Sequence, residues 1–335
     1  MGEIITLSHG SGGKMTNELI NDVFLKYFTN DILDKKNDAG SIDLNEGRFA
    51  YTTDSFVITP IFFRGGDIGK ISVCGTLNDL CASGAKPLYM SAGFILEEGL
   101  SIENLERIVD SMAKVLDEAN VKLIAADTKV VSRGAADQIF INTSGIGIIQ
   151  DGVNIHGANA KPGDKIIITG DVGDHGCSIL MQREELGIEA DIKSYCAPLN
   201  DMIQKILKKT KEVHVMRDPT RGGIATTLNE IAEQSNVGIK IYEQSIPIKR
   251  EVSGVCELLG LDPLYMANEG KMLIIAPSKS CESILETLKN HKYAKNACII
   301  GEVTGEHRRR VIIKTITGGS RILDMLIGDQ LPRIC

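Results

Sequence analysis

The apolar residues of this chain change their spacing several times along its length. Residues 49–53 and 138–143 are short runs rich in β-branched and aromatic side chains, and they predict strands. Two segments between them, 68–81 and 105–119, instead carry apolar residues at helical spacing. Ser101 precedes the second helix at the position typical of a helix start. The first part of the chain is therefore expected to be a mixed α/β domain.

A segment rich in glycine and proline, 151–164, interrupts this pattern and predicts a loop. A strand is expected at 165–169, followed by strands near 271–276, 297–303 and 310–315 and helices near 198–209, 222–235 and 280–290. A chain of 335 residues exceeds what one core usually supports. We therefore expect two domains, 1–155 and 156–330, and a short tail, 331–335.

Composition narrows the possible functions. With 43% apolar and 24% charged residues, the chain has the composition of an ordinary globular protein. Its net charge of −7 argues against nucleic-acid binding, and the basic run 307–310 is interpreted as a solvated turn. No apolar stretch approaches the length that spans a membrane. The eight cysteines form no CxxC pair, which argues against a zinc ribbon and favours a reduced, cytoplasmic protein.

Three aspartates stand out because each is expected where an apolar element meets a polar segment. They are Asp54, Asp79 and Asp127. Carboxylates at such positions can share Mg²⁺, whose preference for oxygen ligands also suits nucleotide phosphates. Structural ion pairs collect the same residue types. Spacing alone leaves both interpretations open.

Two loops have the composition of anion-binding segments. The glycine-rich loop at 8–14 contains His9 and Lys14, and its backbone N–H groups could cradle a phosphate. The loop at 218–223 contains Arg221, a side chain suited to oxyanions. Each loop is equally compatible with a turn that only leads into a helix.

The printed sequence ends in Cys335, preceded by Pro332. A chain end is usually mobile, so this thiol could reach a remote site and leave it again. Proline fixes φ and favours an extended arm. A chance cysteine at a frayed end is the simpler alternative.

Taken together, several motifs resemble one family. They are LSHGSGGKM at 7–15, YTTDSFVI at 51–58, GTLNDLCASGAKP at 75–87, ADTKVV at 126–131, TGDVGDHG at 169–176, MRDPTRGG at 216–223, NEGKM at 268–272 and PRIC at 332–335. In this order they resemble the HypE family of hydrogenase maturation factors, over residues 4–335. That family belongs to a superfamily of ATP-using enzymes with aminoimidazole ribonucleotide synthetase, selenophosphate synthetase and thiamine monophosphate kinase.

The resemblance implies a fold of the α/β and α+β classes. It is the two-domain PurM-like fold, in which the N-terminal domain pairs with a second copy to form a dimeric, β-barrel-like core. The C-terminal α+β domain closes over the nucleotide, and a flexible C-terminal tail carries the cysteine.

The resemblance also implies a reaction. A partner, HypF, carbamoylates the terminal thiol, and the enzyme uses ATP and Mg²⁺ to dehydrate the thiocarboxamide to a thiocyanate. The cyano group then passes to iron held by HypC and HypD, as a ligand for [NiFe] hydrogenase.

On this resemblance we assign roles to individual residues. Asp54, Asp79 and Asp127 are expected to bind Mg²⁺ and ATP, and His9, Lys14, Asn78, Thr128 and Lys129 to contact nucleotide or phosphate. Cys335 is the expected acceptor and Glu269 the general base, with Lys129 and Arg221 as further catalytic residues. A related enzyme acting on a free small molecule, as selenophosphate synthetase does, remains an alternative. So does a non-catalytic carrier with a thiol tail.

Overall fold

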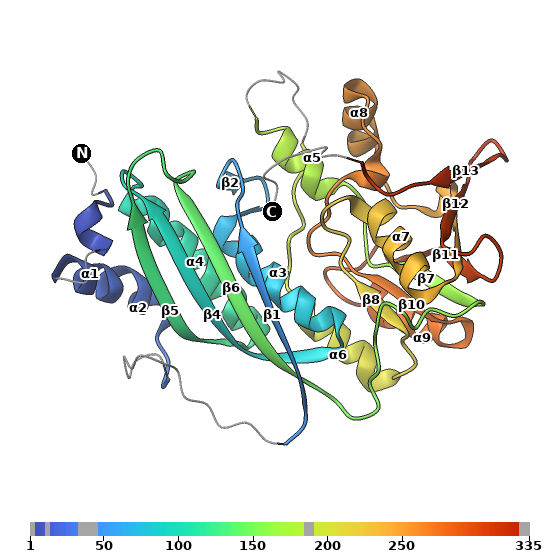
Figure 1. Cartoon of the computed structure of the whole chain (residues 1–335), viewed down its shortest axis with the longest axis horizontal. Helices are drawn as coiled ribbons and strands as arrows, with labels where there is room; N and C mark the ends of the chain where they lie inside the picture. Colours follow the sequence, from blue (N-terminus) through green and yellow to red (C-terminus); the bar gives the residue numbers. More distant parts are fainter. Residues whose placement is uncertain (1–3, 11–13, 33–45, 184–190, 328–335) are drawn as a thin grey trace.

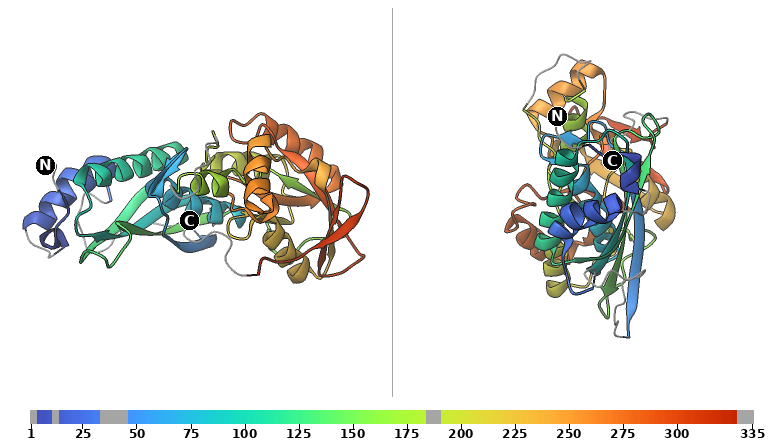
Figure 2. Two further views of the ribbon diagram at one scale, coloured as in Figure 1. Left: turned by 90° about the horizontal axis from the view of Figure 1, so that it is seen from above. Right: turned by 90° about the vertical axis from the view of Figure 1, so that its left-hand side faces the viewer.

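The computed structural model describes residues 4–10, 14–32, 46–183 and 191–327. Two lobes lie side by side along the long axis of the molecule, and each contains a β-sheet covered by helices (Figure 1). A view from above shows the same separation (Figure 2). No helix in these described ranges is long and apolar enough to cross a membrane.

The N-terminal lobe contains a four-stranded sheet in the order β1-β6-β4-β5. Its strands are β1 (Arg48–Phe56), β4 (Ala85–Glu97), β5 (Lys122–Val131) and β6 (Ile139–Ile149). β6 pairs antiparallel with β1 and β4, whereas β4 and β5 are parallel and are connected through helix α4 (Ile102–Ala119). Helix α3 (Ile68–Ala82) packs beside α4 on the same face of the sheet.

Shorter elements complete this lobe. A small hairpin, β2 (Phe62–Phe63) and β3 (Gly66–Asp67), leads into α3. The N-terminal segment forms η1 (Leu7–Gly10), α1 (Lys14–Leu19), η2 (Ile20–Phe24) and α2 (Leu25–Phe28), which lie at the β5 edge of the sheet and against α4.

The C-terminal lobe is built on a seven-stranded sheet in the order β13-β12-β9-β11-β7-β10-β8. Its strands are β7 (Asp164–Ile168), β8 (Val215–Arg217), β9 (Gly238–Tyr242), β10 (Leu273–Pro277), β11 (Cys298–Thr304), β12 (Arg310–Lys314) and β13 (Ser320–Leu323). Alternate strand residues enter two apolar cores, so both faces of the central strands are buried.

Helices cover both faces of this second sheet. α6 (Asn200–Lys209) and α9 (Ser278–Lys289) pack on one face, and α7 (Gly223–Ser235) packs on the other. α5 (Asp174–Leu180) and α8 (Arg250–Leu259) pack against each other through a third apolar cluster. The short 3₁₀ turns η5 (Glu243–Ser245) and η6 (Pro263–Tyr265) flank α8.

Most predicted elements are confirmed, with shifts of a few residues at their ends. α3 and α4 occupy the two predicted helical segments, and Ser101 caps α4 by accepting a hydrogen bond from the Asn104 amide at 3.1 Å. One part of the interpretation was wrong: Asp54 and Asp127 lie inside strands β1 and β5, not in turns after them. The long strand β4 was not predicted at all.

The two lobes share apolar contacts. Ile179, Cys196 and Ala267 of the C-terminal lobe are buried in the main core of the N-terminal lobe. In return, Cys81 of α3 is buried in a core of the C-terminal lobe. Helix α3 therefore lies between the sheets and joins them.

Candidate functional site

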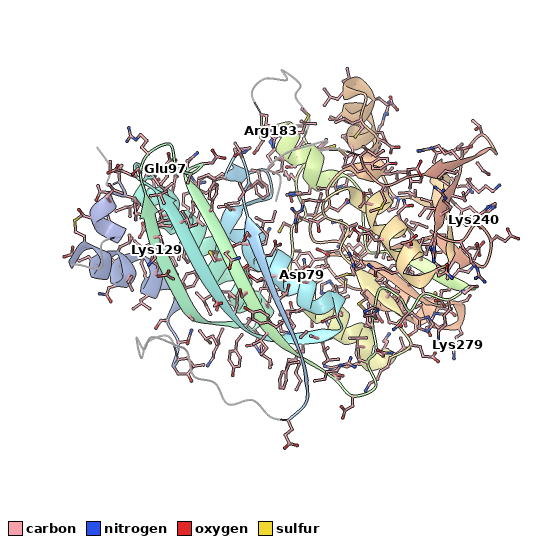
Figure 3. The ribbon with its side chains drawn as sticks, viewed as in Figure 1. Asp79, Glu97, Lys129, Arg183, Lys240 and Lys279 are labelled. Atoms are coloured by element: carbon pink, nitrogen blue, oxygen red, sulfur yellow. The ribbon has the colours of Figure 1, made fainter. Side chains whose placement is uncertain are left out.

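Four carboxyl groups from distant parts of the chain lie close enough to interact electrostatically where the lobes meet. They are Asp54 of β1, Asp79 of α3, Asp218 after β8 and Glu269 before β10, and we call them the acidic cluster. Burial has the largest effect on Glu269 and raises its pKa. The charge of Cys196, and then those of the other three carboxylates, raise it further. Figure 3 shows the labelled Asp79 between the two lobes.

Asp79 is the member of the cluster with the clearest electrostatic perturbation. Burial raises its pKa from 3.8 to about 7, and the neighbouring charges of Asp218 and Asp54 add to the rise. The Thr52 hydroxyl opposes it by donating a hydrogen bond to Asp79 Oδ2 at 3.0 Å. Such a carboxyl gains stability when a cation binds beside it, and perturbed groups of this kind concentrate at functional sites.

Glu269 is the most enclosed member, with 4% of its surface exposed. Its side chain has no hydrogen-bond partner among the described residues, and burial raises its pKa well above 4.5. The ionised form of Glu269 is therefore disfavoured in the nucleotide-free protein. The next residue, Gly270, has φ +65°, and a side chain there would collide with the Tyr195 carbonyl. A glycine is thus required to turn Glu269 into the cluster.

Arginines lie on the same side of the C-terminal lobe. Arg217 forms an ion pair with Glu230 at 2.6 Å, and its charge partly offsets the raised pKa of Asp79. Burial raises the pKa of Asp54, and this is the largest effect on it. The exposed Arg221 partly offsets the rise through its positive charge. The cluster is thus an acidic centre bordered by cations, an arrangement suited to a metal-bound polyphosphate.

Four other described candidates lie at the opposite edge of the first sheet. Asp127 is on β5 and Asp54 on β1, with β6 and β4 between them. Asp127 is paired with Gly93, which is paired in turn with Asn142, and this row faces away from α3. Asp54 is instead paired with Thr143, which contacts α3. Within one chain the three predicted metal aspartates are therefore not brought together.

This second set, which we call the β5-edge group, contains Asp127, Thr128, Lys129 and His9. Lys129 pairs with Asp127 at 3.5 Å, and about 70% of each side chain is exposed. His9 lies in η1, which packs against β5, and its Nδ1 accepts a hydrogen bond from the Thr6 amide at 3.0 Å. Figure 3 shows Lys129 well separated from Asp79.

Three other predicted roles have different outcomes. Asn78 is 1% exposed, and both ends of its amide already bond to backbone groups. The side chain of Lys14 and the whole of Cys335 lie outside the described residues. In the part of the chain that the structure describes, no group of three or more His, Cys, Asp or Glu side chains is arranged to hold a metal. Mg²⁺ binding stays a prediction.

The sequence interpretation missed one residue of the acidic cluster, Asp218, and one hydrogen-bond donor to the cluster, Thr52. Asp218 lies in the same motif as Arg221, and Thr52 lies two residues before Asp54, but neither was selected. An aspartate directly before proline in a strand-to-helix loop is the available signal for Asp218. No local signal identifies Thr52.

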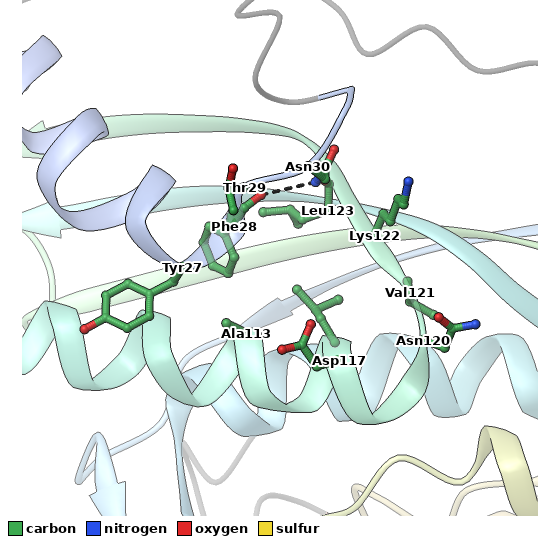
Figure 4. A pocket seen from close by; sticks show the side chains of 11 residues that line it. Tyr27, Phe28, Thr29, Asn30, Ala113, Asp117, Asn120, Val121, Lys122 and Leu123 are labelled. Carbon is green, nitrogen blue, oxygen red and sulfur yellow. Dashed lines mark hydrogen bonds between the residues drawn. The ribbon is translucent and has the colours of Figure 1, made fainter.

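A separate cavity of about 240 Å³ lies between α2, the end of α4 and the start of β5 (Figure 4). Its wall includes Tyr27, Asn30 and Asp117, and Asn30 Nδ2 donates a hydrogen bond to the Leu123 carbonyl at 2.7 Å. It contains none of the predicted site residues.

Comparison with known proteins defines the class that this fold and site represent. Residues 36–149 match the N-terminal domain of AIR synthase related proteins, and residues 161–314 match the C-terminal domain of the same proteins. The predicted two-domain PurM-like fold is thereby confirmed. A thiamine monophosphate kinase from Aquifex aeolicus, at 17% identity and a TM-score of 0.60 over 94% of this chain and 99% of that chain, shares this fold.

More similar proteins define the family within that class. The chain is 47% identical to "Carbamoyl dehydratase HypE" of Azotobacter vinelandii, over 99% of this chain and 97% of that protein. It is 44% identical to the protein of the same name from Escherichia coli K12, over 99% of both chains. A crystal structure of HypE in complex with ATP has a TM-score of 0.94 at 48% identity, covering 98% of this chain and 99% of that one. The chain therefore belongs to the HypE carbamoyl dehydratase family.

A further related structure is of a HypE–HypF complex. It has a TM-score of 0.81 at 49% identity, and the match covers 92% of this chain and 99% of that one.

Proposed function

We propose that this chain uses ATP to dehydrate a carbamoyl group carried on its own Cys335, converting a thiocarboxamide to a thiocyanate. The observation that carries the proposal is the acidic cluster at the junction of the lobes, in a chain of the HypE family whose HypE relative has been solved with ATP. The product supplies the cyanide ligands for the iron centre of [NiFe] hydrogenase.

The described end of the chain supports delivery of the tail to this cluster. The carbonyl of Leu323 accepts a hydrogen bond from Asn229 Nδ2 at 2.8 Å, and that of Asp324 accepts one from the Tyr265 hydroxyl at 2.8 Å. The Leu326 amide donates to Thr226 Oγ1 at 3.3 Å. Residues 323–326 thus run along α7 from Asn229 towards its first turn.

The first turn of α7 directly follows the loop that carries Asp218 and Arg221. The nine residues from 327 to 335 can span at most about 30 Å when fully extended. The arm therefore starts beside the loop that forms one wall of the site.

The reaction requires the carbamoyl oxygen to become a leaving group. Transfer of the γ-phosphoryl group of ATP to that oxygen releases ADP and converts the oxygen to a phosphate ester. Removal of the nitrogen-bound protons and cleavage of the carbon–oxygen bond then give the C≡N group and inorganic phosphate. The net change is thiocarboxamide plus ATP to thiocyanate, ADP, phosphate and a proton.

Glu269 is our candidate for the proton acceptor. The burial that raises its pKa also makes its ionised form a strong base. Arg221, in the loop that also carries Asp218, would hold phosphoryl oxygens as charge develops on them. A cation that reaches the cluster would favour the ionised form of Glu269, which is the form that accepts a proton.

The donor chemistry of the cluster fits Mg²⁺. This ion commonly binds through one or two carboxylates together with phosphate oxygens and does not need a complete protein cage. Asp54 and Asp79 would hold it, and the ion would neutralise phosphoryl charge. The unfavourable ionisation of Asp79 in the nucleotide-free protein is what a bound cation would relieve.

The β5-edge group leads us to include a second copy of the chain in the proposal. The face of the first sheet that turns away from α3 exposes apolar residues, among them Tyr51 at 71% and Ile95 at 42%. Packing two such faces into a barrel-like core would bury them. Asp127, Thr128 and Lys129, with His9 and Lys14, would then complete the site of the neighbouring copy.

The proposal also covers organisation and partners. We propose an N-terminal ATP-binding and dimerisation domain at 1–155, a C-terminal domain at 156–330 and a tail at 331–335. HypF would load Cys335, HypC and HypD would accept the cyano group, and the site of action would be the cytoplasm.

Intact-mass measurement tests this function. After incubation with HypF and its substrates, Cys335 is expected to gain one carbamoyl group, and Mg²⁺–ATP should then remove one water. The variant Cys335→Ala should gain nothing. If Cys335 is carbamoylated but loses no water with ATP, the chain is a non-catalytic carrier. If Cys335 is not carbamoylated and the chain phosphorylates a free small molecule with ATP, the selenophosphate-synthetase-like alternative is supported.

A further inference from the structure

A buried segment of the C-terminal lobe crosses the junction directly beneath the acidic cluster. It comprises residues 194–200, has no regular structure before α6 begins at Asn200, and we call it the strap. Ser194, Cys196, Ala197 and Leu199 are all buried. A loop with so little exposure must find protein partners for its backbone groups.

The strap is attached to the N-terminal lobe at three points. At its start the Ser194 amide donates a hydrogen bond to the Arg64 carbonyl at 2.8 Å. At its end Asn200 Nδ2 donates to the Ala119 carbonyl at 2.9 Å. The third point lies between these two and is Asn78 of α3, which makes two hydrogen bonds to the strap.

Asn78 bonds to the strap through both ends of its amide. Its Nδ2 donates to the Ala197 carbonyl at 3.1 Å, and its Oδ1 accepts from the Leu199 amide at 2.9 Å. An amide in this orientation matches one backbone acceptor and one backbone donor, so a hydrocarbon side chain would leave two buried groups unpaired. With 1% of its surface exposed, Asn78 offers little area to a ligand.

The opposite side of the strap supports Glu269. A side chain at Gly270 would approach the Tyr195 carbonyl to 2.2 Å and the Ala197 amide to 2.7 Å, which shows how closely the Glu269 turn lies on the strap. His175 Nδ1 also meets Ser194 Oγ at 2.9 Å from the C-terminal lobe. The strap is therefore held between Asn78 on one side and the Glu269 turn on the other.

We infer that Asn78 is a positioning residue, which fixes the spacing between its neighbour Asp79 and the strap-supported Glu269, and not a nucleotide contact. The inference rests on the proposed function, because in that function Asp79 binds the cation and Glu269 accepts the proton, so the distance between them matters. It replaces our expectation that Asn78 touches ATP.

The variant Asn78→Ala tests the role, with Asn200→Ala as its matched control. Both remove one asparagine that bonds across the lobes, but only Asn78 adjoins Asp79. For Asn78→Ala we expect single-turnover dehydration of loaded Cys335 to fall at least tenfold. The Kd for Mg²⁺–ATP, measured by calorimetry, should change less than threefold. Asn200→Ala should leave both quantities within twofold of the parent.

The opposite pattern would overturn the inference. If Asn78→Ala weakens Mg²⁺–ATP more than tenfold and reacts at the parental rate under saturating ATP, Asn78 is a nucleotide contact. If neither quantity changes, the strap does not set the geometry.

A second readout needs no dehydratase activity and so separates this inference from the proposed function. Hydrogen exchange by mass spectrometry on Asn78→Ser, the milder variant if Asn78→Ala does not fold, should show faster exchange in peptides covering both 195–199 and 266–271. Faster exchange at 195–199 alone would mean that the strap does not support Glu269, and the inference would fail even if the chain is a dehydratase.

Discussion

The buried charge of Asp79 should lower the free energy of unfolding of the nucleotide-free protein at neutral pH, and this contribution should disappear in acid. Its pKa rises from 3.8 to about 7 on folding, chiefly through burial and then through the neighbouring carboxylates. At roughly 1.4 kcal/mol per pKa unit, that difference corresponds to about 4 kcal/mol. We predict that Asp79→Asn, which keeps an acceptor for Thr52 but cannot ionise, stabilises the fold by up to this amount at pH 8.

The sign follows from proton linkage. Because the pKa of Asp79 is higher in the folded state, this carboxyl ionises first in the unfolded chain. Asp79 therefore does not lower the free energy of unfolding below pH 3.8, and it lowers it increasingly as the pH rises. This effect reaches its full value above about pH 7. At pH 5 the expected gain from Asp79→Asn is therefore below about 2 kcal/mol.

Urea unfolding of both proteins at pH 5, 6, 7 and 8, without nucleotide or divalent metal, measures the difference. Asp127→Asn is the matched control, because that carboxylate is exposed and lies outside the cluster, and we expect a change within about 0.5 kcal/mol. The reasoning would be refuted if Asp79→Asn were destabilising at pH 8, or if its effect did not depend on pH.

Three further predictions concern catalysis and assembly. Glu269→Gln keeps the size of the side chain but cannot accept a proton, so single-turnover dehydration should slow by roughly a hundredfold or more; unimpaired dehydration would exclude Glu269 as the base. Removing residues 328–335 should leave the calorimetric Kd for Mg²⁺–ATP within threefold of the parent, and a larger loss would place the tail in the nucleotide site itself. The third prediction applies if the site is shared between two copies, and it uses a carbamoylated tail peptide as the substrate. After subunit exchange, a mixture of Asp79→Asn and Asp127→Asn chains should recover about a quarter of the parental rate, because half of the dimers are mixed and one of their two sites is intact. No recovery would place both residues in one chain's site.

The helices and strands that alternate at one clear spacing could be predicted from the sequence. α4 is one example, because its apolar stripe and its Ser101 cap agree. β4 escaped prediction because Pro87 and the small residues Ser91, Ala92 and Gly93 interrupt its apolar positions.

The candidate site could be predicted only in part, because its residues meet through contacts between distant segments. α3 is buried on nearly every side, so its sequence has no polar stripe to show that Asn78 faces the strap while Asp79 faces the carboxylates. Asp127 was selected as a metal ligand where an apolar run meets a polar segment, and that role stays a prediction. Only the strand order and the register show that it lies on the far edge and the other face of the sheet.

The fate of one oxygen atom tests the central claim most directly. Cys335 loaded with an ¹⁸O-labelled carbamoyl group should, on addition of Mg²⁺–ATP, release inorganic phosphate that contains one ¹⁸O atom, because the carbamoyl oxygen leaves as phosphate. Mass spectrometry of the phosphate, alongside the intact mass of the protein, gives the answer. If thiocyanate forms while the phosphate is unlabelled and ¹⁸O appears in water, the proposed route through a phosphorylated carbamoyl group is wrong.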